Sequence, residues 1–390
     1  MRIMFAVHTY YPAHNGVQAV TQYIAEGLAK KHEVMVLAEK KNIYCESEVH
    51  NNVAIKRIDV WQKNNRFFGE REKYLSIIEE FAPDALICVC TQSWPFDWIV
   101  SELEHLKCKK ILYTHGYTAY LEKYPIVSDL IRGKLRAFKY HLYWKKYYEK
   151  AYKYIEKFDK VTYLSENNSA NMYAKKHSLN NGMILGNAVE DSFFENCILE
   201  NEDHFEKKRK IQYIYIANYD DNKNQKEVLE TFYRAKLENA NMVFVGGKNN
   251  EYYDELCELN RQKAAINSAT DVQIIYGQSR EKIRELLSES DVFVCGSKHE
   301  EFPVMLCEAA AKGLAIISSN VGHAKEMPGC IVVNNMNEMI EQMKVVAENV
   351  MLRKSNGMKL RHYAQQNCRI KDKISEFESM LEELVRNGEK

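Results

Sequence analysis

Residues 291–326 read DVFVCGSKHEEFPVMLCEAAAKGLAIISSNVGHAKE, and this stretch decides the fold that we expect for the chain. Asp291–Cys295 is a short apolar run, which predicts a buried parallel strand. Val304–Lys312 is rich in helix-forming residues and follows Pro303, a residue that suits the start of a helix. Leu314–Ser318 predicts the next strand. The loop before the helix therefore lies at the carboxyl edge of a sheet, where open α/β sheets bind ligands.

Two carboxylates flank the start of that helix: Glu300 in the loop and Glu308 inside the helix, with seven residues between them. From Pro303 to Glu308 a helix rises about 7–8 Å, which is comparable to the span of a diphosphate. The helix N-terminus offers free N–H groups and a positive dipole end to phosphates. Spacing alone equally fits a solvated loop acid and an ordinary helix surface acid, because Glu pairs at any given spacing are common.

Ten residues of this stretch together resemble the donor-site signature of family 4 glycosyltransferases. They are Glu300, Phe302, Pro303, Leu306, Glu308, Ala309, Gly313, Val321, Gly322 and Glu326. That family retains anomeric configuration and has the GT-B fold. The resemblance implies an α/β protein with two doubly wound Rossmann-like domains that face each other across a cleft, and a C-terminal helix that returns to the first domain.

Length and composition agree with two ordinary domains. The chain has 390 residues, of which 46% are hydrophobic, enough for two cores. Lys+Arg and Asp+Glu balance at 54 each, which argues against a nucleic-acid partner. The ten cysteines contain no Cys-x-x-Cys pattern and favour a cytosolic protein with reduced thiols. We expect neither a secretion signal nor a membrane span, because no suitable apolar run is present.

The first βαβ unit predicts a phosphate-approaching loop. Ile3–Val7 and Glu33–Ala38 are typical of strands, and Val17–Lys31 of an amphipathic helix. The loop lacks the glycine patterns of NAD-binding and P-loop proteins. The family has two adjacent glycines here that approach the donor phosphates. This chain has Asn15-Gly16, and Asn tolerates left-handed backbone angles, although a turn that serves only topology is an alternative for both residues.

Further strands are predicted at Ala54–Val60, Ala85–Cys90 and Lys110–Tyr113, and His115 follows the last of them. In the family, a histidine after this strand lies beside the donor sugar, so the resemblance implies a catalytic role for His115. A lone histidine after a strand is more often structural, and only its register with the other matches favours function.

Residues 132–157 predict a long helix with nine Lys or Arg, two Glu and eight aromatic residues. One helical stripe consists of Tyr140, Trp144, Tyr147, Ala151 and Tyr154, and lysines form a neighbouring stripe. One interpretation is a helix that touches an anionic membrane surface and presents a lipid-linked acceptor. The other is a domain helix with aromatic core residues and solvated lysines.

The middle of the chain predicts a domain boundary. Residues 186–194 resemble the family's N-G-V-D-x-x-x-F segment, and the charged residues 200–210 are typical of a linker. We expect an acceptor-side domain at 1–198, a donor-binding domain at 199–369 and the return of residues 370–390 to the first domain. Strands of the second domain are predicted at Ile211–Ala217, Met242–Gly246, Val272–Tyr276, Asp291–Cys295, Leu314–Ser318 and Cys330–Val333. Helices are predicted at Met336–Leu352 and, with interruptions, at Lys359–Asn387.

The resemblance assigns the remaining donor contacts. Lys223 keeps the lysine that neutralises the donor diphosphate, whereas Asn218 stands where the family has an arginine, so one positive charge is missing. Gln278 follows a strand at the place where the family holds the nucleobase. Further contacts are expected from Phe302, Pro303, Val304 and Met305 at the start of the helix.

The implied activity is a retaining, metal-independent hexosyl transfer from a nucleoside diphosphate sugar to an acceptor hydroxyl. No Asp-x-Asp pattern supports a metal, so Lys223, the helix N-terminus and Gly16 would stabilise the leaving diphosphate. Glu308 would accept hydrogen bonds from the ribose, and Glu300 would hold the sugar and stabilise an oxocarbenium-like state. We expect front-face displacement, because no second carboxylate is placed as a nucleophile.

Two departures from the family pattern leave other functions open: Glu301 replaces a glycine, and His323 replaces the second glycine of a Val-Gly-Gly loop. A non-catalytic nucleotide-sugar-binding partner subunit and a nucleotide-sugar epimerase of the same fold are the alternatives. The resemblance implies a carbohydrate or lipid-linked saccharide acceptor in bacterial surface polysaccharide synthesis. It also implies a cytoplasmic protein, peripheral at the inner face of the membrane.

Overall fold

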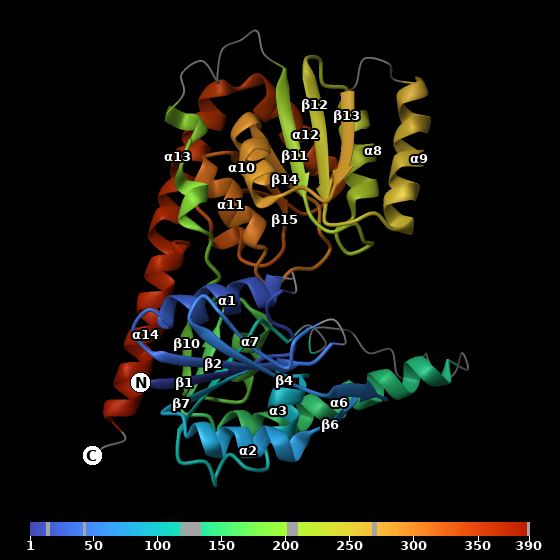
Figure 1. The fold of residues 1–390 in the computed structure, drawn as a ribbon. Helices are drawn as coiled ribbons and strands as arrows, with labels where there is room; N and C mark the ends of the chain where they lie inside the picture. Colours follow the sequence, from blue (N-terminus) through green and yellow to red (C-terminus); the bar gives the residue numbers. More distant parts are fainter. Residues whose placement is uncertain are drawn as a thin grey trace. The chain divides into compact units, whose positions relative to one another are not determined.

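The chain divides into two compact units in a computed structural model. The structure describes residues 1–12, 16–41, 44–117, 120, 134–200, 210–266 and 271–387. The first unit contains residues 1–187 and 370–390, and the second contains residues 188–369. Each unit is built around a sheet of mainly parallel strands with helices on both faces (Figure 1). The prediction of two doubly wound α/β domains is therefore confirmed.

The sheet of the first unit has the order β10-β9-β8-β7-β1-β2-β4-β3, in which the described strands are parallel except for β3. Its strands are β1 (Arg2–Ala6), β2 (Glu33–Glu39), β3 (Ser47–His50), β4 (Val53–Ile58), β7 (Ala85–Val89), β8 (Lys109–Tyr113), β9 (Lys160–Tyr163) and β10 (Gly182–Ile184). A separate hairpin consists of β5 (Val60–Lys63) and β6 (Arg66–Gly69). The helices are α1 (Gly16–Leu28), α2 (Arg71–Phe81), α3 (Trp94–Ile99), α6 (Leu135–Ile155), α7 (Ser169–Lys176) and α14 (Ile370–Arg386).

Alternation of side chains along β1 creates a core on each face of this sheet. Ile3 and Phe5 are buried in one cluster with residues of α1 and α14, and Met4 and Ala6 are buried in the other with residues of α2, α3 and α6. Both faces are covered because a parallel sheet needs helices on each side. Phe377 of α14 stacks on Phe5 with ring centres 6.1 Å apart, so the C-terminal helix is part of the first core.

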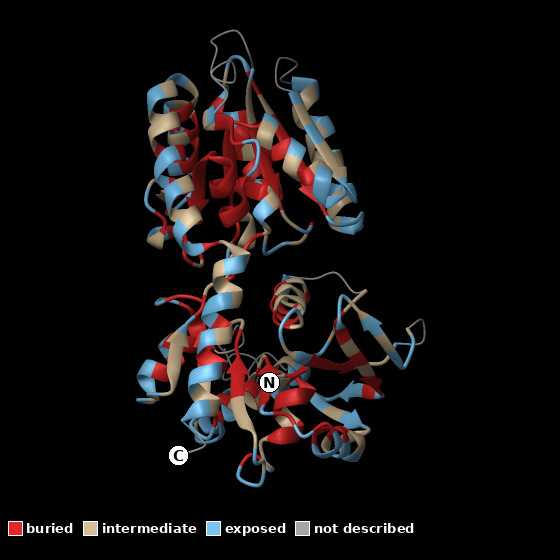
Figure 2. Ribbon diagram, turned by 60° about the vertical axis from the view of Figure 1, so that its left-hand side comes forward, coloured by how far each residue is buried: buried red, intermediate tan, exposed pale blue. Residues whose placement is uncertain are grey.

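The second unit has a six-stranded parallel sheet among its described residues, in the order β13-β12-β11-β14-β15-β16. Its strands are β11 (Ile211–Ile216), β12 (Ala240–Gly246), β13 (Asp271–Tyr276), β14 (Val292–Cys295), β15 (Ala315–Ser319) and β16 (Ile331–Val333). Its helices are α8 (Gln225–Ala235), α9 (Glu251–Ile266), α10 (Arg280–Glu289), α11 (Val304–Lys312), α12 (Met336–Glu348) and α13 (Val350–Asn367), with short 3₁₀ turns η1 (Asp191–Phe194), η2 (Ile198–Glu200) and η4 (Ala324–Glu326). The central strands β11, β12, β14 and β15 are mostly buried, as is most of α11, and the outward faces of the other helices are exposed (Figure 2).

The chain order in this sheet reverses between β11 and β14. Starting from β11, the chain first builds outward to β12 and β13, then returns to place β14 on the other side. The carboxyl ends of β11 and β14 therefore diverge into loops on opposite sides of one crevice, and ligands of open α/β sheets bind at such a switch point. The loops concerned carry Lys223 and Glu300.

Several boundaries differ from the sequence predictions. Residues 188–198, which we placed in the first domain, lie in the second unit, where Phe193 is buried beneath the guanidinium of Arg280. The strand predicted at 54–60 ends at Ile58, before the hairpin begins. The helix predicted at 336–352 ends at Glu348, because Asn349 caps the next helix by accepting a hydrogen bond from the N–H of Leu352.

Candidate active site

Lys223 and Glu300 meet at the switch point of the second sheet. Lys223 comes from the loop after β11, and its Nζ lies 2.5 Å from Oε1 of Glu300, in the loop after β14. The two side chains are only 22% and 15% exposed, so water screens the pair weakly. The structure thus brings together the predicted phosphate cation and the predicted sugar-binding acid.

A hydrogen-bond network fixes these two loops to each other. The hydroxyl of Tyr215 on β11 donates to the carbonyl oxygen of Lys223 at 2.6 Å and lies 2.9 Å from the hydroxyl of Ser297. The side-chain amide of Asn222 donates to the backbone carbonyl oxygen of His299, and the backbone carbonyl oxygen of Asn222 accepts from the N–H of Lys298. The positions of Lys223 and Glu300 are therefore set by backbone contacts as well as by their ion pair.

The N-terminus of α11 begins directly after this loop. Pro303 is the N-cap residue with extended backbone angles, and its own side chain forms no cap hydrogen bond. The first turn contains no acidic residue, so the N–H groups and the positive dipole end keep their attraction for an anion. A β-carbon at Gly322 would lie 2.6 Å from the ring of Pro303, so this glycine allows the loop after β15 to pack behind the helix start.

Glu308 lies on the second turn of α11 and is almost completely buried. Its side chain is 1% exposed, and its Oε1 accepts a hydrogen bond of 2.6 Å from Nη2 of Arg280. Its Oε2 is buried and has no hydrogen-bond partner among the described residues. Burial raises the pKa of this carboxyl, and the charge and hydrogen bond of Arg280 act in the opposite direction.

Phe302 and His323 pack together behind the loop that carries Glu300. Their rings are stacked with centres 3.6 Å apart, and His323 is fully buried. Burial lowers the pKa of His323 to about 3, so the ring is neutral at ordinary pH. His323, which replaces a glycine of the family pattern, is thus a buried support of the loop.

The other residues predicted to bind the donor in this unit are exposed or partly exposed. Asn218 follows β11, and its Oδ1 would lie 2.6 Å from a β-carbon placed on Gly247, at the end of the adjacent strand. Gln278 follows β13, and its side-chain amide donates to the carbonyl oxygen of Tyr276. Val304 and Met305 occupy the first turn of α11 and are half-buried.

In the first unit, His115 follows β8 and Gly16 follows β1, and β7 lies between these two strands in the sheet. Burial lowers the pKa of His115 to about 4, and its Nε2 is buried without a partner among the described residues. Gly16 begins α1, and a β-carbon there would meet nothing within 4 Å, so the fold itself does not require glycine at this position. Asn15 lies outside the described residues.

One cluster of potential metal ligands is present in the part of the chain that the structure describes. Ligand atoms of His32, Glu378 and Glu382 lie within 4.8 Å of one another. Lys31 donates to the same Glu378 across 2.8 Å, which already supplies that carboxylate with a cation. The cluster lies beside α14 in the first unit.

Arg280 is the residue of this site that the sequence analysis missed. It occupies the first position of α10, where a cation is unfavourable to the helix dipole. That unfavourable position was the one local sign in the sequence that Arg280 pairs with a carboxylate outside its own helix. Its partner Glu308 is 28 residues away on the next helix.

The comparison with protein families decides what this second unit is. Residues 199–346 match the model of the family described as glycosyl transferases group 1. They form a group 1 glycosyl transferase domain. Lys223, Glu300, Arg280 and Glu308 all lie within this glycosyltransferase domain. No curated protein sequence matches the chain.

Solved structures establish that the whole chain has the GT-B glycosyltransferase fold. Sucrose-phosphate synthase from Thermosynechococcus elongatus is 14% identical, with 99% of each chain covered and a TM-score of 0.74. A glycosyltransferase from Rickettsia africae ESF-5 is 15% identical, with 99% of each chain covered and a TM-score of 0.75. Anabaena HepE, solved in complex with UDP and glucose, is 11% identical, with 98% of this chain and 100% of that chain covered and a TM-score of 0.71.

Proposed function

We propose that the chain is a retaining, metal-independent glycosyltransferase that moves a hexose from a nucleoside diphosphate sugar to an acceptor hydroxyl. The observation that carries the proposal is the weakly screened ion pair of Lys223 and Glu300 beside the N-terminus of α11, where the N-cap proline forms no side-chain hydrogen bond. A cation and a helix N-terminus suit a diphosphate, and a carboxylate suits sugar hydroxyls.

The proposed reaction begins when the donor diphosphate replaces Glu300 as the ionic partner of Lys223. The diphosphate lies against the first N–H groups of α11, Lys223 neutralises its charge, and Gly16 leaves room for the backbone to approach it. Glu308 Oε2 accepts a hydrogen bond from the ribose. Glu300, released from Lys223, holds sugar hydroxyls and stabilises positive charge at the anomeric carbon, while neutral His115 contacts the sugar.

Bond exchange then occurs on one face of the sugar. The bond from the anomeric carbon to the diphosphate oxygen breaks as the acceptor oxygen approaches from the same side, and the departing phosphate takes the acceptor's proton. Configuration is retained because entry and departure use one face. The chain's own groups stabilise the leaving charge, so this route requires no metal.

A panel of labelled nucleotide sugars tests the proposal. We expect one of them to release free nucleotide slowly without an acceptor, and we expect EDTA to leave that rate unchanged. An isomerised sugar would instead identify an epimerase, and binding with neither product would identify a non-catalytic nucleotide-sugar-binding subunit. Loss of turnover in EDTA, restored by a divalent cation, would contradict metal independence.

For the acceptor, α6 supplies the relevant surface. Trp144 and Ala151 of the aromatic stripe are buried, and Tyr147 donates a hydrogen bond to Asp97, so part of the stripe belongs to the core. Tyr140 and Tyr154 are 38% and 39% exposed. The solvent face also carries a row of exposed lysines: Lys139, Lys145, Lys146, Lys150 and Lys153.

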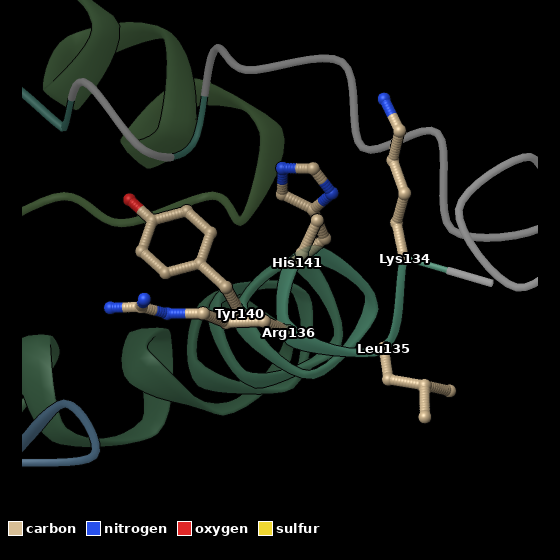
Figure 3. Close-up of a pocket in the computed structure, with 6 residues that line it drawn as sticks. Lys134, Leu135, Arg136, Tyr140 and His141 are labelled. Carbon is tan, nitrogen blue, oxygen red and sulfur yellow. The ribbon is translucent and has the colours of Figure 1, made fainter. Parts of the chain in front are cut away.

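The start of α6 adds an open hollow to this surface (Figure 3). It is lined by Lys134, Leu135, Arg136, Ala137, Tyr140 and His141. Exposed leucine and tyrosine beside cations match the chemistry of an anionic lipid interface. We therefore propose that α6 brings the enzyme to an anionic membrane and to a lipid-linked saccharide acceptor, as in the synthesis of a bacterial surface polysaccharide.

No described helix is long and apolar enough to cross a membrane. The ten cysteines form no disulfide bond, which supports a location in the reducing cytoplasm. We accordingly propose a peripheral position at the cytoplasmic face.

Vesicle binding tests the role of α6. Reversing the charge of Lys145, Lys146 and Lys150 to Glu should abolish co-sedimentation with phosphatidylglycerol vesicles, since each such cation contributes about 1 kcal/mol near an anionic surface. A matched triple reversal at other exposed lysines, Lys30, Lys41 and Lys107, should bind normally. Equal binding of both triple variants, or binding of the wild type to neutral phosphatidylcholine vesicles alone, would contradict the proposal.

A further inference from the structure

Arg280 connects two acidic side chains of the second unit. Besides its 2.6 Å hydrogen bond to Glu308, its Nε and Nη2 lie 3.4 Å from Oε1 of Glu190. Its guanidinium carbon lies 4.7 Å from the centre of the Phe193 ring. The planar guanidinium is thus held by two carboxylates at its edge and by an aromatic ring at its face, which restricts it to one orientation.

Glu308 has one satisfied oxygen and one unsatisfied oxygen. Arg280 holds Oε1, whereas the buried Oε2 has no partner among the described residues. A buried carboxylate oxygen without a donor is costly, and such exceptions in a folded protein often mark a place for a ligand. The proposed donor brings hydroxyl donors in its ribose, and a hydroxyl can supply the missing hydrogen bond.

We propose that Arg280 is a positioning residue that holds Glu308 ionised and oriented so that Oε2 accepts a hydrogen bond from the ribose of a ribonucleoside diphosphate. This inference rests on the proposed function of the same site. According to this inference, Arg280 makes the site prefer nucleotides whose ribose has its hydroxyls. Arg280 acts through Glu308 and need not contact the nucleotide itself.

The charges around Glu308 determine how pH acts on a variant without Arg280. Burial and Glu190 raise the pKa of Glu308, whereas Arg280 and, more weakly, Arg284 lower it. Without Arg280, burial and Glu190 still raise the pKa of Glu308, and only the weaker effect of Arg284 opposes them. Glu308 then takes up a proton at a higher pH, and a protonated carboxyl is a poorer acceptor for the ribose. Nucleotide affinity should therefore weaken as pH falls.

Arg280→Met tests this inference, because methionine keeps an aliphatic contact with Phe193 and removes the cation. Arg284→Met is the matched control: Arg284 lies one turn later on α10, with its guanidinium carbon 5.9 Å from the same ring centre, and it pairs with Glu190 and Glu281. UDP binding is measured by calorimetry for both variants and the wild type between about pH 6 and pH 8.5. Dividing each dissociation constant by the wild-type value cancels the titration of UDP itself.

We expect Arg280→Met to bind UDP about tenfold more weakly or worse, with a ratio that grows as pH falls. Arg284→Met should depart from the wild type far less, because Arg284 acts on Glu308 only weakly and only through its charge. Replacing UDP by its 2′,3′-dideoxy form should weaken binding to the wild type far more than to Arg280→Met. Equal affinities of Arg280→Met and wild type, or a pH-independent loss shared by Arg284→Met, would overturn the inference. If the wild type binds neither UDP, GDP nor ADP, the proposed function fails and takes the inference with it.

Discussion

Glu300→Gln is expected to lower kcat by about a hundredfold or more, because the amide cannot stabilise positive charge at the anomeric carbon. The substitution keeps the shape of the side chain and leaves an oxygen that can accept from Lys223, so the fold should be retained. UDP should bind as tightly as to the wild type or more tightly, since Lys223 is no longer neutralised by a carboxylate. Steady-state turnover and calorimetric UDP binding check the two halves of this prediction.

The matched control uses the other lysine–glutamate pair of the same region. Glu255 pairs with Lys226 and is 54% exposed, in contrast to Glu300. Glu255→Gln should leave both turnover and UDP binding unchanged. Full activity of Glu300→Gln would remove Glu300 from the reaction, and a parallel loss of UDP binding would show that its role is in nucleotide binding instead.

Lys223→Met should have the second large effect, which we expect to appear as weaker binding of UDP. The variant loses the cation proposed to neutralise the diphosphate, and an arginine is already absent at Asn218. We expect the UDP dissociation constant to rise about tenfold to a hundredfold, as for the loss of a charge-assisted hydrogen bond. The KM for the donor should rise in parallel, because the diphosphate is bound in the ground state as well as in the transition state.

Lys226→Met provides the control for this variant. Lys226 lies three residues later, at the start of α8, and pairs with the exposed Glu255. Its replacement should change the UDP dissociation constant little, since exposed ion pairs contribute little. If Lys223→Met bound UDP as the wild type does, the diphosphate would have to bind elsewhere.

Local sequence patterns correctly predicted the strand and the helix that flank the site. The strand at 291–295, the helix at 304–312 and the glycine after it follow from hydrophobic runs and helix-end signals, and Gly313 indeed adopts a left-handed backbone with φ 81°. The loops of Lys223 and Glu300 lie together because their strands are neighbours at the switch point. The sequence predicted the strand that precedes each loop, whereas the contact between the two residues, which are 77 positions apart, came from the structure.

Pairings between distant side chains could not be predicted in this way. Nothing in the local pattern of Arg280 indicates Glu308, because their contact depends on how α10 packs beside α11. The stacking of His323 on Phe302 likewise depends on the loop after β15. For the helix at α6, periodicity placed Trp144 and Tyr154 on one stripe, yet the structure buries the first and exposes the second. Helix packing, which periodicity alone does not specify, makes that difference.

The central claim is that a nucleoside diphosphate lies against the N-terminus of α11 between Lys223 and Glu308. A crystal structure of the chain with UDP tests this most directly. We predict diphosphate oxygens within hydrogen-bond distance of the N–H groups of Val304 and Met305 and of Lys223 Nζ, with a ribose hydroxyl on Oε2 of Glu308. UDP bound at another place, with the Lys223–Glu300 pair intact and Oε2 of Glu308 unsatisfied, would contradict the account.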